Sequence, residues 1–263
     1  MTPPEFVALR WEVAAGIATI TLDRPAALNS LEATLKGELV AAFRQAARDP
    51  EVRVVILTGA GRAFCAGQDL KERLQPEPSP LDVEVRERFN PIVSAIRLLD
   101  KPVIAAINGV AAGAGASIAF ACDLRVAAES ASFVLAFGRI GLIPDSGASW
   151  LLLRLVGLGR ATELMLLGDP VPAAEALRIG LVNRVVPAED LLAEAGRLAA
   201  TLGASAPRAL ALTKRAIRRA LETGFEASLD YEASLQGLAG RTADHAEGLA
   251  AFVEKRSPRF TGS

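Results

Sequence analysis

The fold is decided by residues 101–150, which read KPVIAAINGVAAGAGASIAFACDLRVAAESASFVLAFGRIGLIPDSGASW. The segment opens with an apolar, β-branched run at 103–107 that ends at Asn108-Gly109, the pattern of a buried strand closed by a turn. Residues 113–117 then carry almost no side chains and lead into an apolar helix. We therefore expect backbone N–H groups at the start of this helix to be open to a ligand.

The whole chain is long and apolar enough to bury a large core, since 51% of its 263 residues are hydrophobic and 22% are charged. This composition predicts one α/β unit with a helical appendage. A net charge of −1 argues against a nucleic-acid partner, because coating phosphates needs clustered Lys and Arg.

Two further features limit the location of the protein and its cofactors. The N-terminal sequence MTPPEFVALRWEV has no basic start followed by an apolar run, and no stretch reaches about 18 uninterrupted apolar residues. We expect a cytoplasmic protein without a membrane partner. Cys65 and Cys122 are too few for a disulfide framework or a four-ligand zinc site, and the single His245 closes off most histidine-based metal sites and triads. We expect neither a metal nor a redox cofactor.

The residues before the central segment predict strands and helices in alternation. β-forming runs at 6–13 and 17–22 suit a hairpin, and 52–57 reads as a second buried strand. Leu28-Asn29-Ser30 offers a cap for an amphipathic helix that ends near Asp49-Pro50. Residues 74–81 hold three prolines and predict a mobile surface loop, a candidate lid, before a helix from about Val83 to Leu99.

The residues after the central segment are mostly helical in pattern. We expect short helices near 150–156, 161–167 and 173–177, and a late strand at 180–186. Beyond Pro187 the pattern is helical only, with helices at 188–202, 207–221, 225–235 and 243–255.

Two glycine-bearing loops carry the candidate chemistry, FCAGQDL at 64–70 and NGVAAGAGAS at 108–117. Each follows a predicted buried strand, and neither matches a dinucleotide-binding or Walker pattern. Two such loops can aim two backbone N–H groups at one oxygen and stabilise an oxyanion, an effect of about 10² to 10³ in rate per donor. The alternative is that the glycines only serve turns and close helix packing.

From Phe6 to its C-terminus the chain resembles the crotonase, or enoyl-CoA hydratase/isomerase, superfamily. The segments that carry the resemblance are DRP (23–25), LNSL (28–31), VVILTG (54–59), FCAGQDL (64–70), KP (101–102), NG (108–109), GAG (113–115) and CD (122–123). The resemblance implies an α/β fold, a spiral of ββα units over residues 1–187, and an acyl-CoA substrate. It also implies a helical C-terminal region, residues 188–263, that builds homotrimers, usually paired into hexamers.

The resemblance also assigns roles to individual positions. It places the oxyanion hole at the backbone N–H groups of Gln68 and Ala114, with Lys71 as a phosphate contact. The positions that it implies for substrate and CoA binding are Ala66, Gly67, Gln68, Asp69, Leu70, Lys71, Gly113 and Phe137.

The departures from the family pattern bear on the type of reaction. At the positions of the two glutamates of the family's hydratases, this chain has Ser117 and Phe137. Hydration needs one group to activate water and another to deliver a proton, so these residues disfavour it. Asp145 stands where many hydratases have a glycine, and a carboxylate there matches the base of several isomerases of the family.

Each acidic candidate also has a structural interpretation. Asp145 precedes Ser-Gly and an apolar run, so it can be a helix N-cap instead of a base. Asp123 occupies a position that hydratases and isomerases share, which indicates a structural role. We expect Glu129 and His245 to be exposed side chains outside the site.

The segments GLIPDSGASWLL (141–152) and LQGLAGRTADHAEGLAAFVEKRSPRFTG (235–262) narrow the resemblance to isomerases of phenylacetate degradation. These convert ring-1,2-epoxyphenylacetyl-CoA to the oxepin-CoA. Ala148 stands where a second glycine is more usual, which leaves the pocket shape open. Three alternatives remain at this stage: a 3-enoyl-CoA to 2-enoyl-CoA isomerase of fatty-acid oxidation, a hydratase, and a non-catalytic acyl-CoA-binding subunit.

Overall fold

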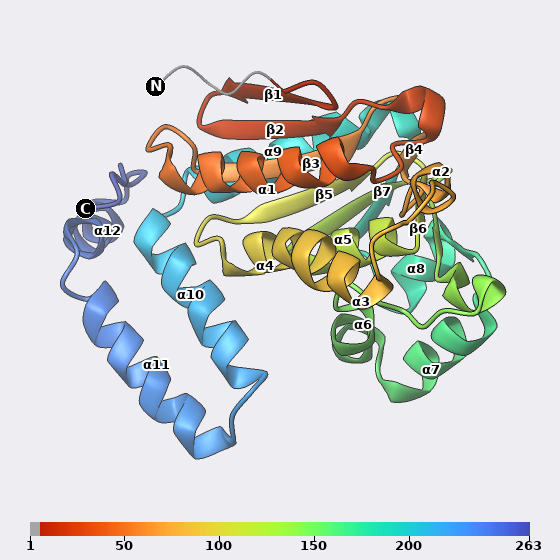
Figure 1. The fold of residues 1–263 in the computed structure, drawn as a ribbon. Helices are drawn as coiled ribbons and strands as arrows, with labels where there is room; N and C mark the ends of the chain where they lie inside the picture. The colour runs from red at the N-terminus through yellow and green to blue at the C-terminus, as the bar shows by residue number, and fades with distance from the viewer. Residues whose placement is uncertain (1–5) are drawn as a thin grey trace.

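The computed structural model describes residues 6–263. Residues 1–5, which the sequence assigns to the spiral core, lie outside the described residues. Two sheets form the centre of the described chain (Figure 1). The larger sheet has the order β1-β2-β3-β5-β7-β10, and the smaller has the order β4-β6-β8-β9. The strands are β1 (Leu9–Ala14), β2 (Ile17–Leu22), β3 (Val54–Gly59), β4 (Ala63–Cys65), β5 (Val103–Ile107), β6 (Val110–Ala112), β7 (Leu124–Ala128), β8 (Ser132–Val134), β9 (Val171–Pro172) and β10 (Arg184–Val186).

The central strands of the larger sheet are buried on both faces. β1 and β2 form the predicted hairpin, and β2, β3, β5, β7 and β10 pair in parallel. Every residue of β3 and β5 is buried, as expected for parallel strands covered by helices on both sides. Helices α1 (Ala33–Arg48) and α4 (Asn90–Leu98) lie on one face, while α9 (Leu191–Gly203) packs its apolar stripe on the other.

The smaller sheet positions the predicted loops. β4, β6 and β8 run parallel, and β9 closes the sheet in antiparallel orientation. The residues around β4 and β6 are predicted as loops from the sequence, so both strands were missed. Each has only three residues, Ala-Phe-Cys in β4 and Val-Ala-Ala in β6, which is too short for a periodic apolar pattern.

The helices confirm the order predicted from the sequence and move several boundaries. They are η1 (Pro25–Ala27), α2 (Leu70–Arg73), α3 (Leu81–Glu84), η2 (Val85–Phe89), α5 (Ala114–Ala121), η3 (Ala136–Ile140), α6 (Ala148–Val156), α7 (Leu158–Leu167), α8 (Ala173–Arg178), η4 (Ala188–Asp190), α10 (Pro207–Ala220), α11 (Phe225–Ala239) and α12 (Ala243–Glu254). The predicted cap of α1 at Leu28-Asn29-Ser30 is wrong. Glu32 caps the helix, because the Asn29 amide is bound to the carbonyl oxygens of Ala60 and Ala63.

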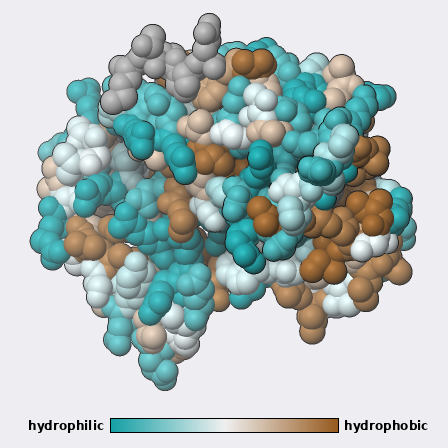
Figure 2. All heavy atoms as spheres, in the orientation of Figure 1, coloured by the Kyte–Doolittle hydropathy of each residue, from teal (hydrophilic) through white to brown (hydrophobic). Residues whose placement is uncertain are grey.

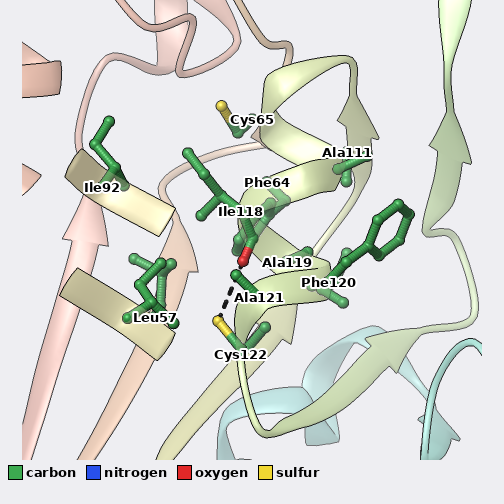
Figure 3. Close-up of a cluster of buried hydrophobic side chains, with 14 of the residues drawn as sticks. Leu57, Phe64, Cys65, Ile92, Ala111, Ile118, Ala119, Phe120, Ala121 and Cys122 are labelled. Carbon is green, nitrogen blue, oxygen red and sulfur yellow. Dashed lines mark hydrogen bonds between the residues drawn. The ribbon is translucent and has the colours of Figure 1, made fainter. Parts of the chain in front are cut away.

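α5 is the most deeply buried helix of the core, since all eight of its residues are buried. Figure 3 shows Ile118 among Ile92 of α4 and Leu57 of β3, while Phe120 points to the other side of the helix. Burial raises the pKa of both thiols, Cys65 and Cys122, to about 12, so they stay protonated at neutral pH. We assign both cysteines a packing role.

The C-terminal helices extend away from the sheets (Figure 1). α10 and α11 form an arm, and buried Lys214 of α10 ties it to the body through Asp123 and the Lys101 carbonyl oxygen. This contact gives Asp123 the structural role predicted for it. The division at residues 187/188 stays a prediction. No helix within residues 6–263 is long and apolar enough to cross a membrane.

Candidate active site

Three neighbouring parallel strands of the smaller sheet end at one edge, where the predicted residues gather. β4 leads to Gln68, β6 leads to Ala114, and β8 leads to Phe137. Because the carboxyl ends of parallel strands meet at the same edge, residues far apart in sequence come together there.

The backbone on either side of Gln68 is held by Leu31. The Leu31 N–H donates to the Gly67 carbonyl oxygen at 2.7 Å, and the Asp69 N–H donates to the Leu31 carbonyl oxygen at 3.2 Å. The Gln68 N–H itself donates to no acceptor within residues 6–263. This peptide is therefore fixed in place with its donor free.

Ala114 is the first residue of α5, so its N–H has no partner within the helix. The preceding residue, Gly113, has φ +52°, and its N–H donates to the Val134 carbonyl oxygen at 2.8 Å. Across the described part of the chain, no acceptor takes the Ala114 N–H. A second fixed and free donor thus stands at the same edge.

The two loops that carry these donors touch each other. A Cβ atom placed on Gly67 would lie 2.7 Å from the Ala112 carbonyl oxygen and 3.4 Å from the Ala114 nitrogen, and Gly67 has φ +85°. Both the left-handed backbone and the close approach require glycine. The structure therefore brings into contact the two loops that carry the predicted oxyanion donors.

Asp145 lies in the loop between η3 and α6, half-buried, with its Oδ1 accepting a hydrogen bond from the Ser146 hydroxyl at 2.9 Å. Burial raises the pKa of Asp145, and the hydrogen bond from Ser146 opposes this only in part. A carboxylate with a raised pKa can accept a proton and release it again near working pH.

The alternative role of Asp145 as a helix cap is wrong. α6 begins at Ala148 with Gly147 as its N-cap, and no side chain caps it. The Ala148 N–H donates at 2.9 Å to the main-chain oxygen of Asp145 instead of its carboxylate. The carboxylate is therefore not needed to start the helix.

The two positions that carry glutamates in hydratases have other functions here. The Ser117 hydroxyl lies 3.1 Å from the Asp145 carbonyl oxygen and so links α5 to the loop that carries Asp145. The buried Phe137 lies beside Gly113, with ring carbon Cζ 3.7 Å from the position that a Gly113 Cβ would take. Ser117 thus holds the loop of the candidate base against α5, and Phe137 forms an apolar wall beside Gly113.

A cavity of about 390 Å³ opens beside Asp145. Its lining combines apolar side chains with a few polar ones: Leu81, Asp82, Val85, Arg86, Asn90, Leu142, Ile143 and Asp145. A partly apolar cavity with few polar groups is typical of a small-molecule site.

The remaining predicted binding residues lie on the same loop and on α2. Asp69 accepts hydrogen bonds from Ser30 and Arg24 and caps α2 through the Lys71 N–H. Although burial alone would raise it, these bonds hold the pKa of Asp69 below its usual value. Asp69 therefore holds the loop in place. Gly67 is buried, Ala66 is half-buried, and Leu70 and Lys71 are exposed, so the predicted CoA contacts of this loop stay predictions.

A buried lysine near this loop was not predicted, because nothing in its sequence pattern separates it from the exposed lysines. Lys36 of α1 is 1% exposed, and its Nζ lies 2.7 Å from Glu72 Oε2 and also contacts Glu84. Glu72 in turn accepts a hydrogen bond at 2.9 Å from the Gln68 side chain. This network connects the Gln68 loop with the helix that lines the cavity.

The other candidates stay outside the site. Glu129 and His245 are exposed, as predicted. Within residues 6–263 no three His, Cys, Asp or Glu side chains are grouped so that they could hold a metal ion. The absence of a metal or redox cofactor stays a prediction.

This chain is similar in sequence and in structure to known proteins. The family model for enoyl-CoA hydratase/isomerase matches residues 12–263. The 1,2-epoxyphenylacetyl-CoA isomerase of Escherichia coli K12 is 46% identical, covering 94% of this chain and 95% of the relative. A probable enoyl-CoA hydratase of Rhodobacter capsulatus is 45% identical, covering 97% and 98%. The crystal structure of enoyl-CoA hydratase from Bacillus anthracis, 38% identical, superposes with a TM-score of 0.94 over 98% of this chain and all of the other.

Proposed function

The chain belongs to the enoyl-CoA hydratase/isomerase family and has the crotonase-type fold expected from its sequence, and from this premise we propose that it is an acyl-CoA isomerase. The proposal rests on which residues occupy the acid and base positions of the site. Asp145, one of the two carboxylates that line the cavity, lies on the loop that Ser117 joins to α5, while Ser117 and Phe137 replace the hydratase glutamates.

The proposed reaction moves a proton within the acyl group. The thioester oxygen sits between the N–H groups of Gln68 and Ala114, which stabilise the negative charge that develops when a proton leaves the neighbouring carbon. Asp145 takes that proton and returns it at another carbon of the conjugated system. The acyl group is thereby isomerised without net addition of water.

The proposed substrate is ring-1,2-epoxyphenylacetyl-CoA, which is converted to the oxepin-CoA. In this reaction the C–C bond shared by the epoxide and the six-membered ring breaks, and the enolate character created by loss of the proton supports this opening. The support is the 46% identity to the 1,2-epoxyphenylacetyl-CoA isomerase and a cavity lined by both apolar and polar side chains. The second candidate is the shift of a 3-enoyl-CoA double bond to the 2 position, since the same donors and carboxylate serve it. Comparing kcat/KM for the epoxide and for 3-hexenoyl-CoA distinguishes them, and a preference for 3-hexenoyl-CoA would reject the epoxide as the main substrate.

Hydration of crotonyl-CoA is expected to be negligible. Ser117 is engaged with the Asp145 loop and Phe137 is apolar, so neither can activate water or deliver a proton as a carboxylate does. A spectrophotometric assay of crotonyl-CoA beside the isomerase assay, on one preparation, measures both. Hydration at a rate similar to isomerisation would overturn the proposed reaction type.

The proposed assembly is a homotrimer or a hexamer, as the family resemblance implies. Figure 2 shows hydrophobic side chains gathered over α6 and α7, where Leu158, Leu166 and Leu167 are exposed. Phe225, at the start of α11, is 74% exposed. Apolar side chains gathered in this way are typical of an interface. Sedimentation velocity is expected to show trimers or hexamers, and a monomer at micromolar concentration would contradict the proposal.

A non-catalytic acyl-CoA-binding subunit fits the site less well. Binding alone does not require a half-buried carboxylate with a raised pKa at the acyl cavity. Such a group lowers the stability of the protein at neutral pH, which a role in binding only would not explain.

The cytoplasmic location expected from the sequence is part of the proposal.

A further inference from the structure

One continuous helix forms a wall of the cavity that Asp145 also lines. It runs from Leu81 to Leu98 through α3, η2 and α4, and its middle turn, η2, is a π-turn in which the Asn90 N–H donates to the Val85 carbonyl oxygen. Residues five apart are separated by about 140° around an α-helix. A π-turn brings them close to one face. Both Val85 and Asn90 therefore line the cavity.

The amide of Asn90 is exposed toward this cavity. No hydrogen bond from its side chain is made to any of residues 6–263, although the amide carries two N–H donors and one acceptor. Asp145, on a different segment of the chain, lines the same cavity. The π-turn thus places a neutral donor in the same cavity as the candidate base, in keeping with the frequent occurrence of such turns at functional sites.

The charges around Asn90 narrow the kind of acyl group that fits. Two carboxylates, Asp82 and Asp145, and one cation, Arg86, line the cavity, so its lining carries no excess of positive charge. An acyl group ending in a carboxylate would need an unmatched cation here. Leu142 and Ile143 add apolar surface. The cavity suits an uncharged acyl group that carries a hydrogen-bond acceptor.

We infer that Asn90 is a specificity-determining residue that donates a hydrogen bond to a neutral oxygen of the acyl group, while Asp145 moves the proton. An ether-type oxygen, as in an epoxide or an oxepin ring, accepts such a bond. This inference rests on the proposed function, because it takes the cavity to be the acyl site. It adds a substrate class, acyl-CoA thioesters with a neutral ring or chain oxygen, and the residue that selects it.

The test compares pairs of substrates with and without the oxygen. One pair is the ring epoxide and 3-hexenoyl-CoA, and the other is a 3-enoyl-CoA with an ether oxygen in its chain and the all-carbon isostere. Asn90→Leu keeps the size of the side chain and removes the donor. In each pair the ratio of kcat/KM, oxygen-bearing over all-carbon, is expected to fall at least about tenfold.

Two further variants make the result specific. Asn90→Asp keeps the shape and replaces the donor by an acceptor, so the ratio is expected to fall as in Asn90→Leu. Ser94→Leu makes a similar polar-to-apolar change at an exposed position of α4 outside the cavity, and its ratios are expected to match wild type. The role of Asn90 would be overturned if Asn90→Leu lowered kcat/KM equally for both substrates of a pair, or if it left the ratios unchanged.

A failure of the proposed function can be distinguished from a failure of the role of Asn90. If the wild-type enzyme does not turn over the ring epoxide, the proposed substrate is wrong. The ether pair still decides the role of Asn90, because a preference for the ether-bearing chain that disappears in Asn90→Leu does not depend on the epoxide.

Discussion

Replacing Asp145 by asparagine is expected to lower kcat for isomerisation by at least about 10², because the variant keeps the shape of the side chain but cannot carry a proton. Neither oxyanion donor changes, so the Kd for an acyl-CoA is expected to stay close to that of wild type. Measuring kcat and Kd on the same preparation separates chemistry from binding. Near-wild-type turnover would end the role of Asp145 as the base.

The stability of the same variant provides the control. A carboxyl whose pKa is raised by folding contributes stability below its unfolded pKa and loses that contribution as the pH rises through its folded pKa. At neutral pH the charged Asp145 therefore costs stability, and Asn removes the charge. The Tm of Asp145→Asn is expected to equal or exceed that of wild type, so a lower kcat with a lower Tm would indicate misfolding instead of a lost base.

The pH dependence follows from the same pKa. Asp145 acts as a base only when it is deprotonated, so activity is lost as the pH falls through its folded pKa. Since burial raises that pKa, the acid limb of kcat/KM is expected at a higher pH than for an ordinary aspartate.

The segments of the candidate site could be located from the sequence because each of them is local. The GLIPDSG segment, the two glycine-bearing loops and the departures at Ser117 and Phe137 are each read from a few adjacent residues. The parallel strands β4, β6 and β8 then bring these short segments to one edge, which requires only the order of the strands.

The parts that the sequence did not reveal depend on contacts between distant residues. The Ser117 hydroxyl meets the Asp145 carbonyl oxygen 28 positions away, and Lys36 meets Glu84 across 48. The π-turn at 85–89 lies within a helix expected from Val83 to Leu99, which begins at Leu81 in the structure. An apolar periodicity of 3.6 shows a helix, but it does not show one inserted residue.

Replacing Gly67 by alanine is expected to lower kcat by about 10² to 10³, the loss expected when an oxyanion donor is displaced. The new Cβ would lie 2.7 Å from the Ala112 carbonyl oxygen and 3.4 Å from the Ala114 nitrogen, so the two loops must separate. The N–H groups of Gln68 and Ala114 would then no longer meet at one oxygen. The kcat of the variant for isomerisation measures this displacement.

Gly16→Ala is the matched control for this variant. Gly16 has φ +78°, close to the +85° of Gly67, but the nearest atom to a new Cβ is the Glu51 carbonyl oxygen at 3.6 Å. Both variants strain a left-handed backbone by about 1–2 kcal/mol, so both are expected to lower Tm. Only Gly67→Ala also moves the donors. We therefore expect the folded fraction of Gly67→Ala to lose activity and that of Gly16→Ala to keep it. If the folded Gly67→Ala enzyme turned over as fast as Gly16→Ala, the two N–H groups would not be the oxyanion hole.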